Sequence, residues 1–275
     1  MYKRIPAFLQ QAHALQAERA IEQLCEQEID YLYATHTIAT AHTYITQYRH
    51  AITRANLPTA FLVYMRGRRD ASETLRINYA RKLARRHRQQ YPITNADALV
   101  AHAANCLQSE RYASIIVGLE LLTGRRPYEL GVTASFSVSD HAQYVLFRGQ
   151  AKTREALRAF QQYPIPVLIP GLPICHALMR LRTIRSFEGM TSAQFDNTVG
   201  KALRDTRKAL FGSLLPLGAL HVKEALRKIY GCIAYSWFAR PDISVNAYLA
   251  DILGHGPDDV NTANSYQDFY LATIE

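Results

Sequence analysis

The segment YASIIVGLELLTGRRP, residues 112–127, constrains the fold of this chain more than any other. Its first part is apolar at roughly helical spacing and predicts a buried helix. We expect Gly124 to end that helix, because glycine accepts the left-handed conformation that closes a helix. Arg125 and Arg126 follow at once, and then a proline that should keep the helix from resuming. Burying an arginine charge is costly, so this position indicates a functional role.

The composition indicates a globular protein with a polyanionic partner. The chain has 275 residues, of which 48% are hydrophobic, so it can form two modest domains with real cores. A net charge of +9 favours nucleic acid, with an anionic membrane surface as the alternative. No apolar run approaches the ~18 residues that span a bilayer, and no secretory or lipidation signal is present, so we expect no membrane association. The four cysteines, Cys25, Cys106, Cys175 and Cys232, form no CxxC pair, which predicts reduced core thiols and no metal site.

Residues 1–92 are predicted to be helical throughout, with amphipathic stretches over 10–34 and 37–55 and a short buried piece over 57–65. Residues 66–88 contain nine Lys or Arg against two acids, a net of +7. Four apolar side chains, Leu75, Ile77, Tyr79 and Leu83, supply the other side of a helix with a cationic face. Such a face suits DNA phosphates, although a solvated surface helix would have the same pattern. The predicted DNA-binding residues here are Arg68, Arg69, Arg81, Lys82, Arg85, Arg86 and Arg88.

The second part of the chain predicts helices around a small sheet. YPITNAD, residues 91–97, is the best boundary, which gives domains over 1–92 and 93–275, and Asn95 can cap the next helix. Alternating patterns over 132–140 and 143–154 predict paired strands, and the prolines of 163–170 confine a third strand to an edge. Helical patterns resume from residue 172. The predicted fold is mainly α with a small antiparallel β-sheet in the C-terminal domain.

Five separated residues, Arg126, Lys152, Arg227, His255 and Tyr266, have the chemistry needed to break a phosphodiester without metal. A tyrosine hydroxyl, with a reference pKa of about 10, needs its charge stabilised as it attacks phosphorus. Arginine pairs neutralise the non-bridging oxygens and remain charged when buried. A lysine can protonate the departing 5′ oxygen, and a histidine can bind the phosphate or help to deprotonate the tyrosine.

Each residue also has a purely structural explanation. Arg126 could pair with Glu129, and Lys152 could be an exposed turn residue. Arg227 and Lys228 could lie on the solvent-exposed face of a helix. His255 could simply follow a helix, and Tyr266 could be a core side chain. The order of the five along the chain favours the catalytic interpretation.

That order resembles the tyrosine recombinase superfamily over about residues 110–270. TGRRPYEL resembles the first arginine box, EALRKIY the second box, and ILGHG the Leu-Gly-His before the nucleophile, while Lys152 matches the lysine of the β-hairpin. The double arginine, LFRGQAKTR, and the eleven-residue step from His255 to Tyr266 are more similar to the telomere resolvases, or protelomerases. The resemblance implies a tyrosine-recombinase-like catalytic domain preceded by a helical DNA-clamping domain.

The second box departs from the family at one position, because Glu224 replaces the usual histidine three residues before Arg227. A carboxylate there would repel a phosphate unless it were protonated or paired, so Glu224 could weaken activity. We expect Lys223 to supply the missing cation, with His221 as a further candidate.

The resemblance implies DNA cleavage and rejoining through a 3′-phosphotyrosyl link at Tyr266, without cofactor or metal. The expected partner is double-stranded DNA with an inverted-repeat site, bound by a homodimer. After cleavage, the freed 5′ ends of the DNA are expected to fold back and close hairpins. Nine residues follow Tyr266, which fits a dimer. Arg125 and Arg154 are further expected DNA contacts, and the protein should be DNA-associated in a bacterial cytoplasm, encoded by the bacterium or a phage. The alternatives are a site-specific integrase that exchanges strands between duplexes and a catalytically inactive DNA-binding relative.

Overall fold

A computed structural model describes residues 4–151, 161–222, 224–254 and 266–272. The chain forms two compact units, Met1–Arg85 and Arg86–Glu275, and each has its own hydrophobic core. The boundary expected at residues 92 and 93 stays a prediction of where the functional domains meet.

The described residues of the first unit form helices α1 (Arg4–Ala12), α2 (Glu18–Thr35), α3 (Ile38–Arg54), α4 (Thr59–Tyr64) and the first part of α5 (Arg69–Arg88). The single helix expected over 10–34 is wrong, because the chain turns between α1 and α2. This turn lets Phe8 and Ile21 enter one core. Phe8 packs edge-on against Tyr48 and Phe61, with ring centroids 5.1 and 6.1 Å apart.

The second unit contains β1 (Tyr91–Ile93), α6 (Ala96–Cys106), α7 (Tyr112–Thr123), the π-helix η1 (Glu129–Thr133), β2 (Ser135–Val138), β3 (Tyr144–Arg148), β4 (Tyr163–Pro166), α8 (Gly171–Ile184), α9 (Ser192–Phe211), the short 3-10 helix η3 (Ala219–His221), α10 (Ala225–Phe238), α11 (Val245–Leu253) and β5 (Phe269–Leu271). The side chain of Asn95 caps α6 as expected, by accepting a hydrogen bond from the Ala98 amide at 2.8 Å.

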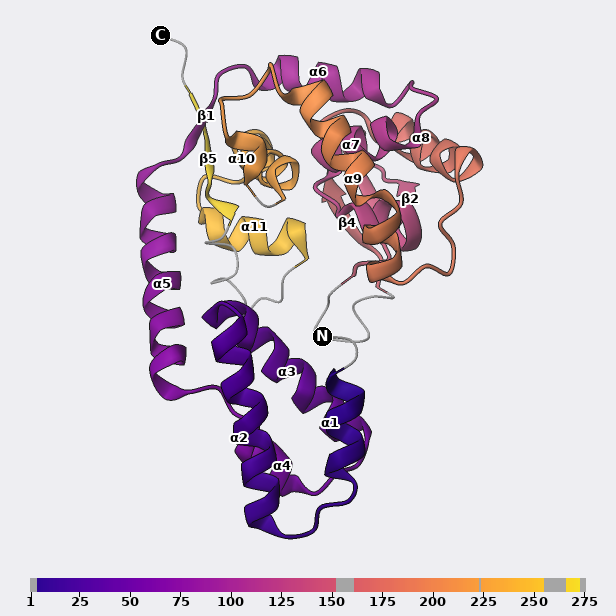
Figure 1. Cartoon of the computed structure of the whole chain (residues 1–275). Helices are drawn as coiled ribbons and strands as arrows, with labels where there is room; N and C mark the ends of the chain where they lie inside the picture. The colour runs from indigo at the N-terminus through magenta and orange to yellow at the C-terminus, as the bar shows by residue number, and fades with distance from the viewer. Residues whose placement is uncertain (1–3, 152–160, 223, 255–265, 273–275) are drawn as a thin grey trace. The chain divides into compact units, whose positions relative to one another are not determined.

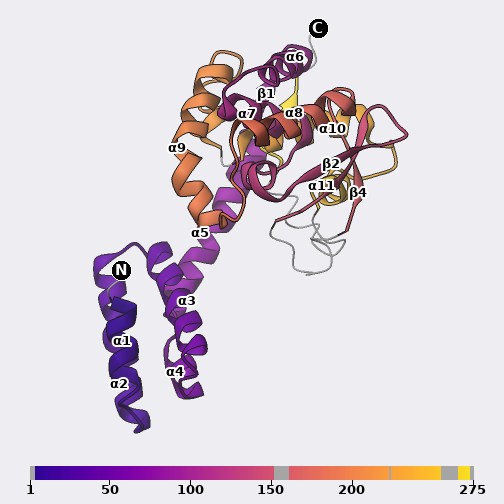
Figure 2. The same cartoon turned by 90° about the vertical axis from the view of Figure 1, so that its right-hand side faces the viewer.

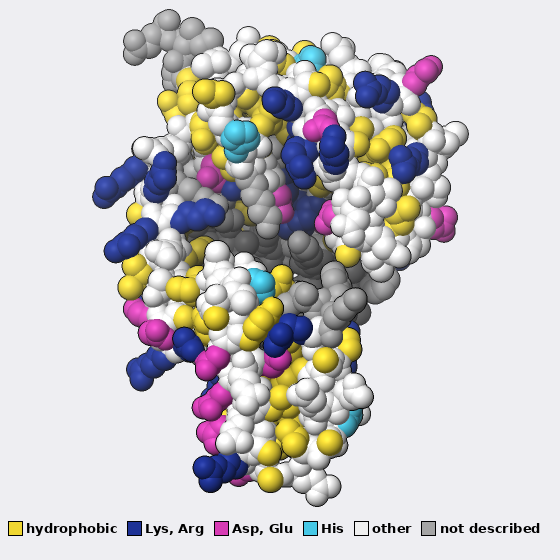
Figure 3. Space-filling view, in the orientation of Figure 1, with side chains coloured by type: hydrophobic (Ala, Val, Ile, Leu, Met, Phe, Trp, Pro, Cys, Tyr) yellow, Lys and Arg dark blue, Asp and Glu magenta, His cyan; other side chains and the backbone are white. Residues whose placement is uncertain are grey.

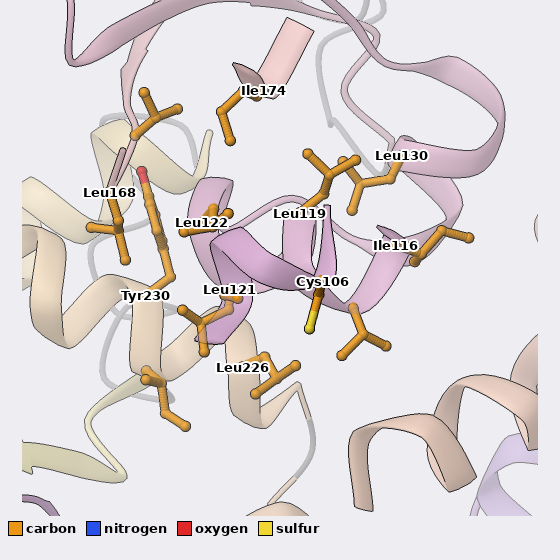
Figure 4. Packing of buried hydrophobic residues seen from close by; sticks show 14 of the residues in the cluster. Cys106, Ile116, Leu119, Leu121, Leu122, Leu130, Leu168, Ile174, Leu226 and Tyr230 are labelled. Atoms are coloured by element: carbon orange, nitrogen blue, oxygen red, sulfur yellow. The ribbon is translucent and has the colours of Figure 1, made fainter. Parts of the chain in front are cut away.

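Helix α7 is the centre of the second unit. It contacts α6, α8, α9 and α10, and Figures 1 and 2 show it enclosed by them. All of its residues from 113 to 123 are buried. In Figure 4, Leu122 of α7 and Tyr230 of α10 lie near Leu168, which follows β4. The apolar pattern therefore predicted this buried helix correctly.

Two small sheets complete the unit. Strands β2, β3 and β4 form the expected antiparallel sheet, with β3 in the middle and the proline-containing β4 at an edge. Strand β5 pairs in parallel with β1, so Phe269 lies opposite Tyr91; this pair was not predicted. The predicted fold class, mainly α with a small antiparallel sheet, is confirmed.

Candidate active site

The end of α7 places the two arginines. Gly124 adopts the expected left-handed conformation, with φ 64°, and a Cβ there would lie 2.2 Å from the Tyr230 ring. Glycine is therefore required both for the backbone angle and for space. After this exit, Arg125 is fully buried, whereas the Arg126 side chain stays 14% exposed.

The expectation that Pro127 keeps the helix from resuming is wrong. Residues 127 and 128 are helical and lead into η1. A proline fits the first turn of a helix, because the amide hydrogen that it lacks has no partner there. This new helical segment places Glu129 beside Arg126.

Glu129 links Arg126 to the segment that follows β3. Its Oε1 accepts a hydrogen bond from Arg126 Nη1 at 3.0 Å, and its Oε2 accepts one from the Arg126 amide at 2.9 Å. The same Oε1 accepts from the Ala151 amide at 3.1 Å, immediately before Lys152 in sequence. Arg126 Nε is buried and has no hydrogen-bond partner among the described residues. This donor can therefore serve a ligand.

Arg227 lies in the first turn of α10 and is fully buried. Its Nη2 donates to the Leu253 carbonyl at 2.9 Å, its Nη1 donates to the Gly124 carbonyl, and its Nε donates to Tyr266 Oη at 3.4 Å. Burial on its own would lower the pKa of Arg227, but the negative charge that surrounds the guanidinium prevails, so its pKa is raised. The alternative that Arg227 and Lys228 lie on the solvent-exposed face of a helix is wrong, because both residues are buried.

Glu224 lies between the arginines and Tyr266. Its carboxylate is 3.9 Å from Arg126 Nε and 3.8 Å from Arg227 Nε, and it accepts a hydrogen bond from Tyr266 Oη at 3.2 Å. Glu224 has φ 57°, a conformation that is unfavourable for any residue with a Cβ. The structure thus brings Arg126, Arg227 and Tyr266 together, as predicted, around a carboxylate to which the sequence interpretation gave only a weakening effect.

Residues that the sequence interpretation missed fix the segment of Tyr266. Lys228 forms a buried ion pair with Asp268, two residues after Tyr266, and the Lys228 ammonium lies 5.9 Å from the centre of the Tyr266 ring. The parallel pairing of β5 with β1 anchors the same segment. Gln150, which is also buried, donates from its side-chain amide to the Gly254 carbonyl. In the sequence, these residues could have been found only as charged or polar residues adjacent to the predicted motifs.

Four predicted site residues, Lys152, Arg154, Lys223 and His255, lie outside the described residues. Their described neighbours belong to the site, since Ala151 bonds Glu129, Glu224 meets both arginines, and Gly254 bonds Gln150. His221, the further candidate in the second box, is exposed.

Comparison with known families identifies this arrangement. The family described as telomere resolvase ResT/TelK catalytic domain matches residues 90–269 of the chain, and these residues include the whole site described above.

The chain belongs to this telomere resolvase family.

A curated relative is telomere resolvase ResT of Borreliella burgdorferi, which is 23% identical over 159 residues, or 58% of this chain and 34% of the relative. The chain thus spans about a third of the length of that relative. Among solved structures, protelomerase TelA covalently complexed with substrate DNA is 30% identical with a TM-score of 0.87, covering 98% of this chain and 87% of the other. A TelA mutant complexed with a DNA hairpin product has a TM-score of 0.88 at 30% identity and the same coverage. Protelomerase TelK complexed with substrate DNA, at 20% identity and a TM-score of 0.56, is similar in fold; the match covers 99% of this chain and 58% of TelK.

In this member of the telomere resolvase family, α5 presents a cationic surface. Figure 3 shows Lys and Arg side chains along this helix. The exposed members of the predicted DNA-binding set are Arg68, which precedes α5, and Arg69, Arg81, Lys82, Arg85 and Arg88 on the helix, while the side chain of Arg86 lies outside what the structure describes. Arg68 also forms an ion pair with Asp30 at 2.6 Å. The expected apolar side of α5 is largely exposed at Ile77 and Tyr79, which are 41% and 62% accessible.

Arg125 is a correction to the predicted DNA contacts. Its side chain is fully buried, donates to the Thr123 carbonyl at 3.3 Å, to Tyr163 Oη at 3.2 Å and to the Ile252 carbonyl, and lies over the Phe147 ring. Arg125 therefore joins α7, the sheet and α11. Unlike Arg227, whose Nε donates to Tyr266, Arg125 directs all three of its side-chain nitrogens into this packing, so its role is structural.

A cavity of about 490 Å³ opens beside Arg126 and Glu224. It is also lined by Glu120 and Arg207, which form an ion pair at 2.7 Å. Burial raises the pKa of the Glu120 carboxyl, and Arg207 opposes this effect. No cluster of His, Cys, Asp or Glu suited to a metal ion occurs in the described part of the telomere resolvase chain. Among the same residues, no helix is both long and apolar enough to cross a bilayer.

Proposed function

We propose that this chain cleaves and rejoins double-stranded DNA through a 3′-phosphotyrosyl link at Tyr266 and closes the resulting ends as hairpins. Tyr266 attacks the scissile phosphorus, while Arg126 and Arg227 neutralise the non-bridging oxygens. Lys152 protonates the departing 5′ oxygen, His255 binds the phosphate, and Lys223 adds a cation. The covalent link retains the energy of the broken bond, so that rejoining needs no cofactor or metal.

The convergence of two arginines on the nucleophile is the observation that supports this proposal most. Arg227 Nε lies 3.4 Å from Tyr266 Oη, and Arg126 Nε lies 3.9 Å from the Glu224 carboxylate that this hydroxyl contacts. These residues come from the end of α7, from α10 and from the last segment of the chain. A phosphate placed among them would meet donors that remain charged when water is excluded.

The relatives support the same reaction. Protelomerase TelA has been solved covalently complexed with substrate DNA, and a TelA mutant has been solved with a DNA hairpin product. We propose that two copies of this chain bind an inverted-repeat site, with each copy cutting one strand, and that the protein is DNA-associated in a bacterial cytoplasm. The exposed cations of α5 would bind DNA phosphates without reading the base sequence.

The test begins with a library of randomised inverted-repeat duplexes, from which the wild-type chain selects its site by covalent capture. A version of the selected site with a nick beside the scissile phosphate then traps the covalent intermediate, because the short product strand diffuses away. We expect an adduct at Tyr266, its loss in Tyr266→Phe, and snap-back hairpins on denaturing gels with intact DNA. Arg126→Ala should abolish cleavage and retain most of the binding affinity.

A catalytically inactive DNA-binding protein is the second candidate function, and Glu224 is the observation in its favour, since its carboxylate lies where a phosphate would enter. A wild-type chain that binds DNA but forms no covalent adduct with any duplex of the library would establish that candidate. Joined products from two separate duplexes, instead of hairpins, would establish a strand-exchanging integrase.

A further inference from the structure

We propose that Glu224 is the general base that accepts the proton of Tyr266 as the tyrosine attacks, an inference that rests on the proposed function. Tyr266 Oη donates to Glu224 Oε2 at 3.2 Å, and Arg227 Nε donates to the same Oη at 3.4 Å. An arginine in a protein cannot accept a proton. Of these two partners of the hydroxyl, only the carboxylate can act as a base.

The backbone fixes this carboxylate in place. Glu224 immediately precedes α10, and its carbonyl accepts the hydrogen bond of the Lys228 amide at 3.1 Å. Its left-handed backbone conformation is a local strain of the kind found at functional sites. The side chain is 26% exposed and directed towards Arg126 and Arg227, so that it is held near the hydroxyl and accessible from the neighbouring cavity.

The charge balance explains why a carboxylate is tolerated beside a phosphate. Before attack, one negative charge is on Glu224 and one is on the phosphodiester. In the reaction the Oη–P bond forms, the P–O5′ bond breaks, the phenolic proton moves to Glu224, and the departing O5′ takes the proton assigned to Lys152. The second negative charge of the pentacoordinate phosphorus therefore appears as the charge of Glu224 disappears, and the charge facing the arginines does not increase.

Rejoining reverses each step. The 5′ hydroxyl attacks phosphorus, the P–Oη bond breaks, and protonated Glu224 returns its proton to the Tyr266 oxygen. The carboxylate then pairs with Arg126 and Arg227 again, as it does in the structure. One residue would thus serve as the base in cleavage and as the acid in rejoining.

Several charged groups act on the proton affinity of this carboxylate. Its carboxylate lies against Arg126 and Arg227 and lines the same cavity as the Glu120–Arg207 pair. Glu129 is bonded to Arg126, and the Lys228–Asp268 pair lies beside Tyr266. Arg126 and Arg227 hold positive charge beside the Glu224 carboxylate. A bound phosphate offsets their charge and makes the carboxylate more basic when the proton must move.

The test measures adduct formation at saturating DNA, with the covalently selected and nicked duplex as the probe. Glu224→Gln keeps the shape of the side chain but removes the base, and we expect adduct formation to be slowed by about a hundredfold or more while DNA affinity is kept or improved. Glu110→Gln, an exposed residue with the same change of charge, is the matched control and should react like the wild type.

A histidine separates a proton-transfer role from a structural one. Glu224→His should recover part of the lost rate, and its rate should rise with pH through about 6.5, the reference pKa of histidine. The rate of Glu224→Gln should not show this rise with pH at about 6.5. If Glu224→Gln reacts within about threefold of the wild type, or faster, Glu224 is not the base. The same holds if Glu224→His is as slow as Glu224→Gln at all pH values. A wild-type chain that forms no Tyr266 adduct would instead refute the proposed function itself.

Discussion

The buried ion pair of Lys228 and Asp268 provides the most demanding test of how the Tyr266 segment is anchored. The two side chains are 5% and 7% exposed, and they join α10 to the residues that follow the nucleophile. Replacing Asp268 with alanine would leave an ammonium group buried without this partner. Removing one member of a buried pair typically costs about 3–5 kcal/mol, which is a factor of roughly a hundred to several thousand in the folding equilibrium constant.

The paired replacement separates the charge from the packing. Lys228→Met combined with Asp268→Leu removes both charges and keeps apolar volume, so we expect the double variant to regain most of the stability that Asp268→Ala removes. Trp237, the only tryptophan of the chain, lies on α10 and reports the unfolding of this unit by its fluorescence in urea. A loss below about 1 kcal/mol for Asp268→Ala, or a double variant as unstable as the sum of its single variants, would refute this reasoning.

The remaining predictions concern the glycine that ends α7, the buried Arg125, the exposed arginines of α5 and a buried thiol. Gly124→Ala should cost more than the ~1–2 kcal/mol of a left-handed alanine, because its Cβ would also clash with the Tyr230 ring, and urea unfolding measures this loss. Arg125→Ala should lower the unfolding temperature and leave the salt dependence of DNA binding unchanged, whereas a changed salt slope would return this residue to the DNA interface. Neutralising the α5 arginines 81, 85 and 88 should flatten the salt dependence by about 0.9 for each DNA phosphate that the protein no longer neutralises, measured by fluorescence anisotropy, and an unchanged slope would remove α5 from the interface. Burial raises the pKa of Cys232 to about 11, so iodoacetamide at about pH 8 should label it far more slowly in the folded chain than in urea, and equal rates would contradict this burial.

Many local elements could be predicted because their causes lie within a few residues. Gly124 ends α7 and Asn95 caps α6 through contacts with their own helices. The alternation of side chains predicted β2 and β3, and the prolines of β4 placed that strand at an edge. The family motifs also predicted that Arg126, Arg227 and Tyr266 would meet.

Two local expectations failed, at the turn between α1 and α2 and at Pro127, but the other failures depend on contacts between distant segments. Arg125 and Arg126 are adjacent arginines, yet Arg125 is buried against α11 and the sheet, whereas Arg126 lies at the site. The pairing of β1 with β5 joins the start of the second unit to the segment after Tyr266.

The sequence therefore determined the helices, the antiparallel sheet and the kinds of side chain available for phosphate chemistry, since periodicity, caps and turns act over short stretches of chain. Only the tertiary structure decided which arginine is buried and gave Glu224 the proposed role, because burial and a partner's distance arise when separate elements pack together.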